Sequence, residues 1–74
     1  MNIMKNNFTL YYKELSKHNF RTIPEMVNVS EEKAKDYCTN NQYELRKNAI
    51  ELYVSVDNQV IEPVDVIWNL DKFN

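Results

Sequence analysis

The stretch that decides the fold is residues 26–41, MVNVSEEKAKDYCTNN. Its first residues, Met26, Val27 and Val29, are typical of a strand. Ser30 then follows as a preferred N-cap, because its hydroxyl can accept hydrogen bonds from the free N–H groups of a first helical turn. Two glutamates come next, where negative charge suits the positive end of the helix dipole. The stretch therefore predicts the end of a strand, a cap and the beginning of a helix.

The predicted helix is amphipathic and short. Ala34, Tyr37 and Cys38 recur at three- and four-residue spacing, so they share one face. A helix of this length is marginal in water on its own, and we expect a sheet beneath it. The asparagines at 40 and 41 are plausible stop residues, because Asn tolerates the left-handed conformation. Residues 42–48, QYELRKN, either extend the helix to Lys47 or form a connecting loop.

Two strands are expected before the helix. Residues 8–15, FTLYYKEL, alternate so that Phe8, Leu10 and Tyr12 share one face. After a turn at residues 16–19, residues 20–29, FRTIPEMVNV, predict a second strand. Pro24 interrupts this strand, and proline cannot donate to a ladder. The second strand is therefore expected at a sheet edge or with a bulge.

Two more strands are expected after the helix. Residues 49–56, AIELYVSV, alternate between an inward set beginning at Ile50 and an outward set of Glu51, Tyr53 and Ser55. Asp57 and Asn58 are a two-residue hairpin signal. Residues 60–68, VIEPVDVIW, predict the fourth strand, in which Pro63 again indicates an edge or a bulge.

The sum is a single α+β domain over residues 1–74, with β-β-α-β-β order. An antiparallel sheet of about four strands carries one helix packed on one face. The predicted core is Phe8, Leu10, Tyr12, Ile23, Val27, Ala34, Cys38, Ile50, Leu52, Val54, Val64, Val66 and Trp68.

Composition limits the possible functions. A hydrophobic content of 43% and nine aromatic residues indicate a real core. A chain of 74 residues leaves little room for a deep enclosed active site. The absence of glycine excludes phosphate loops, dinucleotide fingerprints and Gly-flanked nucleophiles. Asparagine is the next best residue for positive φ, and turns or element ends are expected at Asn19, Asn40, Asn41, Asn48 and Asn58.

No catalytic or metal-binding constellation is predicted. Cys38 is the single cysteine and His18 the single histidine, so soft metal ligands number two at most. We expect a solvated turn residue at His18 and a packing residue at Cys38, and hence no enzyme and no cofactor. The competing hypothesis is a small hydrolase or metal enzyme that uses both side chains. A lone cysteine, a start without a signal-peptide pattern and no membrane-length apolar run predict a cytoplasmic protein without a membrane partner.

Charge is unevenly distributed along the chain. Residues 48–71 hold five acids and no base, and they predict an acidic surface with an aromatic in it, formed by Glu51, Tyr53, Asp57, Glu62 and Asp65. Such a surface complements a basic groove on a partner. The alternative is a nucleic-acid-binding hairpin formed by Tyr11, Lys13, Lys17 and Arg21. The net charge of −2 argues against direct nucleic-acid binding, and both charged segments can also be plain solvated faces.

The segments FTLYYKEL, MVNVSEEKAKDYC and AIELYVSV lie in a layout that resembles the small single-domain proteins encoded by AT-rich phages. Some of those proteins inhibit bacterial defence systems such as CRISPR–Cas. The resemblance rests on size, lack of glycine and layout, and it carries over no functional residue. It implies an inhibitor that occludes a surface of a host protein or a protein–nucleic-acid complex. A homodimer is also expected, because only Pro24 and Pro63 blunt the two sheet edges.

Overall fold

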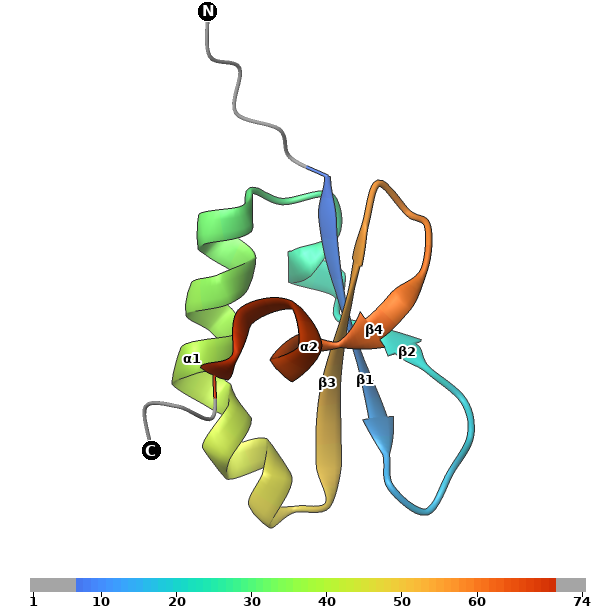
Figure 1. Ribbon diagram of the computed structural model, residues 1–74. Helices are drawn as coiled ribbons and strands as arrows, with labels where there is room; N and C mark the ends of the chain where they lie inside the picture. Colours follow the sequence, from blue (N-terminus) through green and yellow to red (C-terminus); the bar gives the residue numbers. More distant parts are fainter. Residues whose placement is uncertain (1–6, 71–74) are drawn as a thin grey trace, which may run out of the picture.

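The computed structural model describes residues 7–70. Its elements, in chain order, are β1 (Phe8–Glu14), β2 (Arg21–Thr22), the 3₁₀ helix η1 (Pro24–Met26), α1 (Glu31–Lys47), β3 (Ile50–Val56), β4 (Ile61–Pro63) and α2 (Val64–Trp68). The strands form one antiparallel sheet in the order β2-β1-β3-β4. Both α-helices lie on the same side of this sheet (Figure 1). The predicted α+β fold, a four-stranded antiparallel sheet with a helix packed on it, is confirmed.

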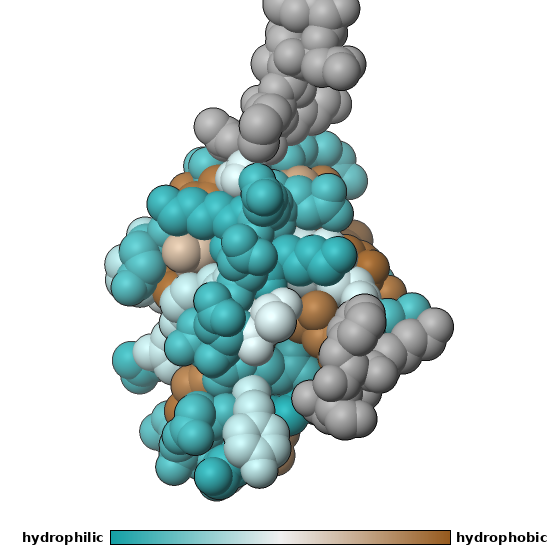
Figure 2. Space-filling model, turned by 90° about the vertical axis from the view of Figure 1, so that its left-hand side faces the viewer, coloured by the Kyte–Doolittle hydropathy of each residue, from teal (hydrophilic) through white to brown (hydrophobic). Residues whose placement is uncertain are grey.

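Helix α1 begins where the sequence predicts and ends later. The Ser30 side chain accepts a hydrogen bond from the Lys33 N–H at 3.2 Å, which is the expected cap. The helix does not stop at the two asparagines, and the longer alternative to Lys47 is the observed one. The Asn41 amide instead donates to the Tyr37 carbonyl one turn back, at 2.8 Å. The solvent side of α1 is largely hydrophilic (Figure 2).

Strands β1 and β3 form the centre of the sheet. They pair over seven residues each, from Phe8 opposite Val56 to Glu14 opposite Ile50. This register places Leu10, Leu52 and Val54 on the side of α1, and all three are fully enclosed. The predicted hairpin after β3 is present, with Asp57 and Asn58 at φ of 58° and 55°. Other left-handed positions fall at Asn28, Ala49 and Asn69, so most asparagines expected at positive φ do not adopt it.

The prediction for residues 20–29 as a full strand is wrong. Only Arg21 and Thr22 pair with β1, and Pro24 starts the 3₁₀ helix. This turn buries Met26 and leaves Val27 44% exposed, so Val27 is not the core residue that alternation predicts. The edge position indicated by Pro24 is confirmed, because β2 is the outermost strand on its side.

The prediction for residues 60–68 as a strand is also wrong after Pro63. The chain leaves the sheet there and forms α2, where residues four apart share a face. Val64 and Trp68 are therefore buried together, whereas Val66, predicted in the core, is 64% exposed. Proline explains the break, because it cannot donate to a ladder and is favoured at the beginning of a helix.

Trp68 connects three parts of the molecule. Its ring stacks on Phe8 of β1, with 6.0 Å between centroids and 24° between planes. Its indole N–H donates to Glu31 Oε2 in the first turn of α1, at 3.1 Å. Among residues 7–70, the buried hydrophobic residues are Leu10, Ile23, Met26, Ala34, Cys38, Leu52, Val54, Val64, Trp68 and Leu70. Of the remaining predicted core residues, Phe8, Tyr12 and Ile50 are half-buried.

We expect Trp68→Ala to lower the free energy of unfolding by about 3–5 kcal/mol, because it removes a buried indole and leaves a cavity. The matched control is Val66→Ala in the same helix, which should change stability by less than about 0.5 kcal/mol because Val66 is exposed. Urea denaturation of both variants measures the difference. Equal effects of the two substitutions would contradict the placement of α2.

Candidate binding surface

One face of the sheet has no helix over it. Figure 1 shows α1, α2 and η1 on the opposite side. Strand alternation and the observed register assign the side chains of this uncovered face. We call it the outer face, and it consists of Thr9, Tyr11 and Lys13 of β1, Thr22 of β2, Glu51, Tyr53 and Ser55 of β3, and Ile61 and Pro63 of β4.

Two tyrosines occupy the middle of the outer face. Tyr11 and Tyr53 are directly opposite each other on the two central strands. The hydroxyl of Tyr11 hydrogen-bonds with Ser55 Oγ at 2.9 Å, and that of Tyr53 donates to Glu51 Oε1 at 2.7 Å. These two hydrogen bonds hold both tyrosine rings in fixed orientations. Ser55 itself is completely enclosed, although its outward direction predicts exposure.

A third aromatic ring comes from the loop after β1. Phe20 packs edge-on against Tyr53, with 4.7 Å between centroids and 80° between planes, and remains 43% exposed. Lys13 Nζ lies 6.0 Å from the centroid of the Tyr53 ring, and it donates to the Lys17 carbonyl at 3.3 Å. We call Tyr11, Phe20 and Tyr53 the aromatic cluster. One cation, Lys13, and one anion, Glu51, flank it as a cross-strand pair.

The surroundings of Tyr53 favour the protonated form of its hydroxyl. Burial, the hydrogen bond to the Glu51 carboxylate and the charge of that carboxylate together raise the pKa of Tyr53 to about 12. At neutral pH the hydroxyl is therefore a donor that is already engaged by Glu51. It contributes position and apolar area to the outer face.

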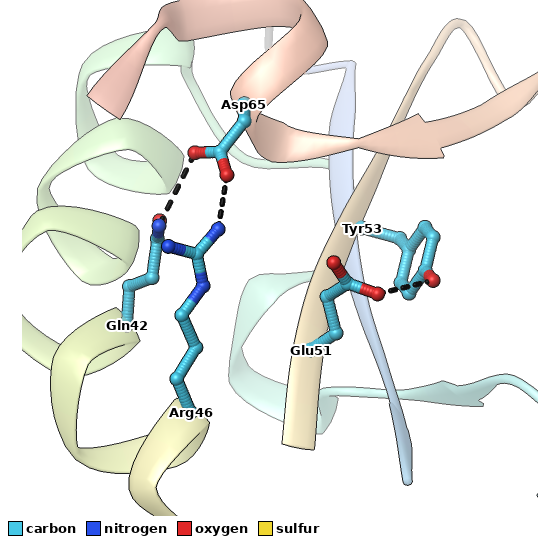
Figure 3. Close-up of polar contacts among 5 residues, drawn as sticks. All are labelled: Gln42, Arg46, Glu51, Tyr53 and Asp65. Carbon is cyan, nitrogen blue, oxygen red and sulfur yellow. Dashed lines mark hydrogen bonds and ion pairs between the residues drawn. The ribbon is translucent and has the colours of Figure 1, made fainter. Parts of the chain in front are cut away.

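The five residues of the predicted acidic surface do not share one face. Glu51 and Tyr53 lie on the outer face, whereas the register places Glu62 opposite Val54, on the α1 side. Asp65 is in α2, where its carboxylate accepts from Gln42 Nε2 at 3.2 Å and pairs with Arg46. Figure 3 shows this group on the opposite side of β3 from Tyr53.

The last acid of the predicted surface, Asp57, lies in the turn after β3, where its carboxylate accepts from the Asn7 amide. The acidic segment of the sequence is therefore divided among three places. Asp65 is on the α1 side because the chain turns into α2 after Pro63, whereas Glu62 is there because it is opposite Val54 in the sheet.

The alternative basic set is divided as well. Tyr11 and Lys13 lie on the outer face, but Arg21 is opposite Tyr12 and so belongs to the α1 side of the sheet. Lys17 is in the loop after β1, in an ion pair with Glu14 at 3.5 Å. The outer face thus combines two residues of each predicted set. Ile61 and Pro63 of the outer face, and Phe20 of the aromatic cluster, are not among the predicted site residues.

The two side chains of the competing enzyme hypothesis, His18 and Cys38, lie in different environments. His18 is exposed in the loop after β1. Cys38 is enclosed on the inner side of α1. Its burial, and to a smaller extent the charge of Asp65, raises the pKa of its thiol to about 12. Such a thiol is not a nucleophile at neutral pH. Within residues 7–70, no three His, Cys, Asp or Glu side chains are grouped as metal ligands.

Comparisons with known proteins give no relative. No protein-family model matches the sequence, and searches of curated proteins and of solved structures find no match. In the described part of the chain, every helix is too short or too polar to cross a bilayer.

The raised pKa of Tyr53 predicts a loss of stability in alkali. A phenol whose folded pKa lies above its unfolded value near 10 stabilises the fold fully below pH 10, and this contribution disappears as pH rises towards 12. Tyr53→Phe removes this titration. Its free energy of unfolding should therefore fall less steeply between pH 10 and 12 than that of the wild type, as measured by urea denaturation. Parallel profiles of the two proteins in that window would contradict the buried, Glu51-bonded hydroxyl.

Proposed function

We propose that the protein is a non-enzymatic binding protein whose outer face docks on a partner protein. The observation that carries the proposal is the aromatic cluster, three rings gathered on a sheet face that no helix covers. Phe20 is 43% exposed, and Tyr11 and Tyr53 are half-buried. Apolar surface that is gathered in one accessible patch commonly marks an interaction site. Tyrosine is also among the residues that dominate interface energetics.

The chemistry of the outer face favours a protein over a polyanion. Its two charged side chains, Lys13 and Glu51, have opposite signs and stand opposite each other. Ile61 and Pro63 add apolar area beside Tyr53, with Val60 70% exposed next to them. Interfaces between proteins combine aromatic and apolar centres with a few paired charges in this way.

The aromatic cluster is also prepared for binding. The hydroxyls of Tyr11 and Tyr53 are held by Ser55 and Glu51, so these rings lose little rotamer freedom when a partner covers them. A preorganised surface pays a smaller entropic cost on association. This supports a partner that is recognised by shape and apolar contact.

The class of partner follows from the resemblance to small phage-encoded inhibitors. Such a protein works by occluding a surface, and a single uncovered face on a chain of 74 residues suits that mechanism. The partner we propose is a bacterial defence protein or its complex with nucleic acid. A typical interface buries about 800 Å² on each side, so the partner is expected to contact the loops around the outer face as well as its strands.

Site-specific photocrosslinking tests the proposal. A photoreactive phenylalanine analogue replaces Phe20 in one variant and Tyr43 in another. Tyr43 is the matched control, because it is an aromatic residue on α1 and is 67% exposed on the far side of the molecule. Irradiation in a bacterial lysate should give a discrete adduct from position 20 and none from position 43. The same adducts from both positions would count against the outer face.

Once the partner has been identified, alanine substitutions measure how much each aromatic ring contributes to the binding affinity. Tyr53→Ala should weaken binding by about 30-fold or more, the effect of losing a central interface aromatic worth about 2 kcal/mol. Tyr43→Ala should change the affinity less than about twofold. Isothermal titration calorimetry measures both, after circular dichroism has established that the variants are folded. Unchanged affinity of folded Tyr53→Ala would exclude the aromatic cluster as the anchor.

One observation favours a second candidate, the binding of single-stranded nucleic acid. Tyr11 and Tyr53 stand on the two central strands of a four-stranded sheet, with Lys13 beside them. Aromatics at such positions stack bases in known RNA-binding sheets. This candidate requires affinity that falls steeply with salt and is lost in Lys13→Glu. Filter binding with single-stranded DNA and RNA decides it, and absence of binding at low salt rules it out.

A further inference from the structure

A separate cleft lies on the α1 side of the sheet, where α1 and η1 diverge over the end of β1. Its volume is about 260 Å³, which is below the range of about 300–1,000 Å³ typical of sites for drug-sized ligands. Ile23, Leu45 and Ile50 supply an apolar floor, of which Ile23 is buried and the other two are half-buried. The remaining lining residues are Tyr12, Pro24, Glu25 and Tyr37.

Three of the residues that line this apolar cleft carry polar groups. They are Tyr12 and Tyr37, each with a hydroxyl, and Glu25, with a carboxylate. Among residues 7–70, these three side-chain groups have no hydrogen-bond or ion-pair partner. The pKa of Tyr37 is raised, first by burial and then by the charges of Glu25 and Cys38, so the Glu25 carboxylate acts on the phenol across the cleft.

We propose that this cleft binds one lysine or arginine side chain of a partner polypeptide. The apolar floor suits the methylene stem of such a side chain. Glu25 and the two hydroxyl oxygens can accept its donors, and the tyrosine rings can contact the cation through their faces. The inference does not rest on the outer face, which is on the opposite side of the sheet.

Size and charge together select this occupant. Sites for drug-sized ligands measure about 300–1,000 Å³, so the cleft has room for a single side chain. A purely apolar side chain would bury its surface but leave the carboxylate and hydroxyls without donors. Arg21 is the cross-strand neighbour of Tyr12, yet it does not line the cleft and has no ion pair with Glu25. The negative charge of Glu25 is therefore available to a cation from outside.

The test is an NMR titration of the ¹⁵N-labelled full chain with N-acetyl-arginine amide and with its neutral isostere, N-acetyl-citrulline amide. Saturable shifts should appear at the amides of Ile23, Tyr37 and Ile50, and the arginine compound should bind about fivefold more tightly. Glu25→Gln should reduce that preference to less than about twofold. The control is Glu32→Gln, which alters an exposed glutamate in the first turn of α1 and should leave the preference unchanged.

The outcomes separate the proposal from its rivals. Equal affinity for arginine and citrulline compounds would overturn it, because the cleft would then be an apolar groove without charge selection. Shifts confined to residues outside the cleft, or none at accessible concentrations, would also overturn it. Tyr37→Phe provides a second variant that keeps the ring and removes only the hydroxyl. It should weaken arginine binding while its spectrum keeps the dispersion of the folded protein.

Discussion

The pairing of β1 with β3 is the constraint on which the rest of the structure depends. It joins residues that are 36 to 48 positions apart along the chain, and it continues without a break from Phe8 opposite Val56 to Glu14 opposite Ile50. Because side chains alternate, one register decides both faces of the sheet. It turns Leu10 and Leu52 towards α1 and Tyr11 and Tyr53 away from it. A slip by one residue would exchange the core for the outer face, so the buried leucines also fix the position of the tyrosines.

The outer strands add little length to this central pair. β2 has two residues and β4 has three, and each is followed by a proline-started turn or helix on the α1 side. Short edges offer few backbone groups to another chain, which limits association edge to edge. If a second copy of the chain binds, the outer face therefore gives it more contact area than either edge. Both departures from the sheet also supply core residues, since η1 buries Met26 and α2 buries Trp68.

Much of this fold could be predicted from the sequence because its signals are local. Ser30 with its following glutamates defines the beginning of α1, and the alternation in β1 and β3 defines their faces. The end of α1 could not be predicted in the same way. Asn40 and Asn41 are good stop residues, but Gln42 and Leu45 continue the inward side of the helix, and tertiary packing outweighs the local preference. In residues 64–68, Val64, Val66 and Trp68 fit a period of two, while Val64 and Trp68 alone also fit a helical turn.

The candidate site was only partly predictable for a related reason. Alternation identified Tyr11, Lys13, Glu51 and Tyr53 as outward residues but could not show that their strands are neighbours. The acidic residues 51–65 form a group along the chain, yet Pro63 sends Asp65 to the side where Arg46 neutralises it. Phe20 escaped prediction because its contact with Tyr53 depends on the path of a loop. The charge pattern along the chain predicted two separate surfaces, one acidic and one basic. The observed strand order instead brings Tyr11 and Lys13 of the basic set next to Glu51 and Tyr53 of the acidic set on one face.

Helices cover one face of the sheet only, and the proposed binding requires the aromatic cluster on the other face to be accessible to a partner. Relaxation of ring protons by an inert, soluble paramagnetic probe measures this directly in the isolated protein. The exposed ring of Phe20 should be relaxed strongly, as that of exposed Tyr43 is, and the half-buried ring of Tyr53 to an intermediate extent, equally so in dilute and in concentrated samples. Protection of both rings at the level of the buried Leu52 methyl groups, at every concentration, would show that something covers the outer face and would contradict the account.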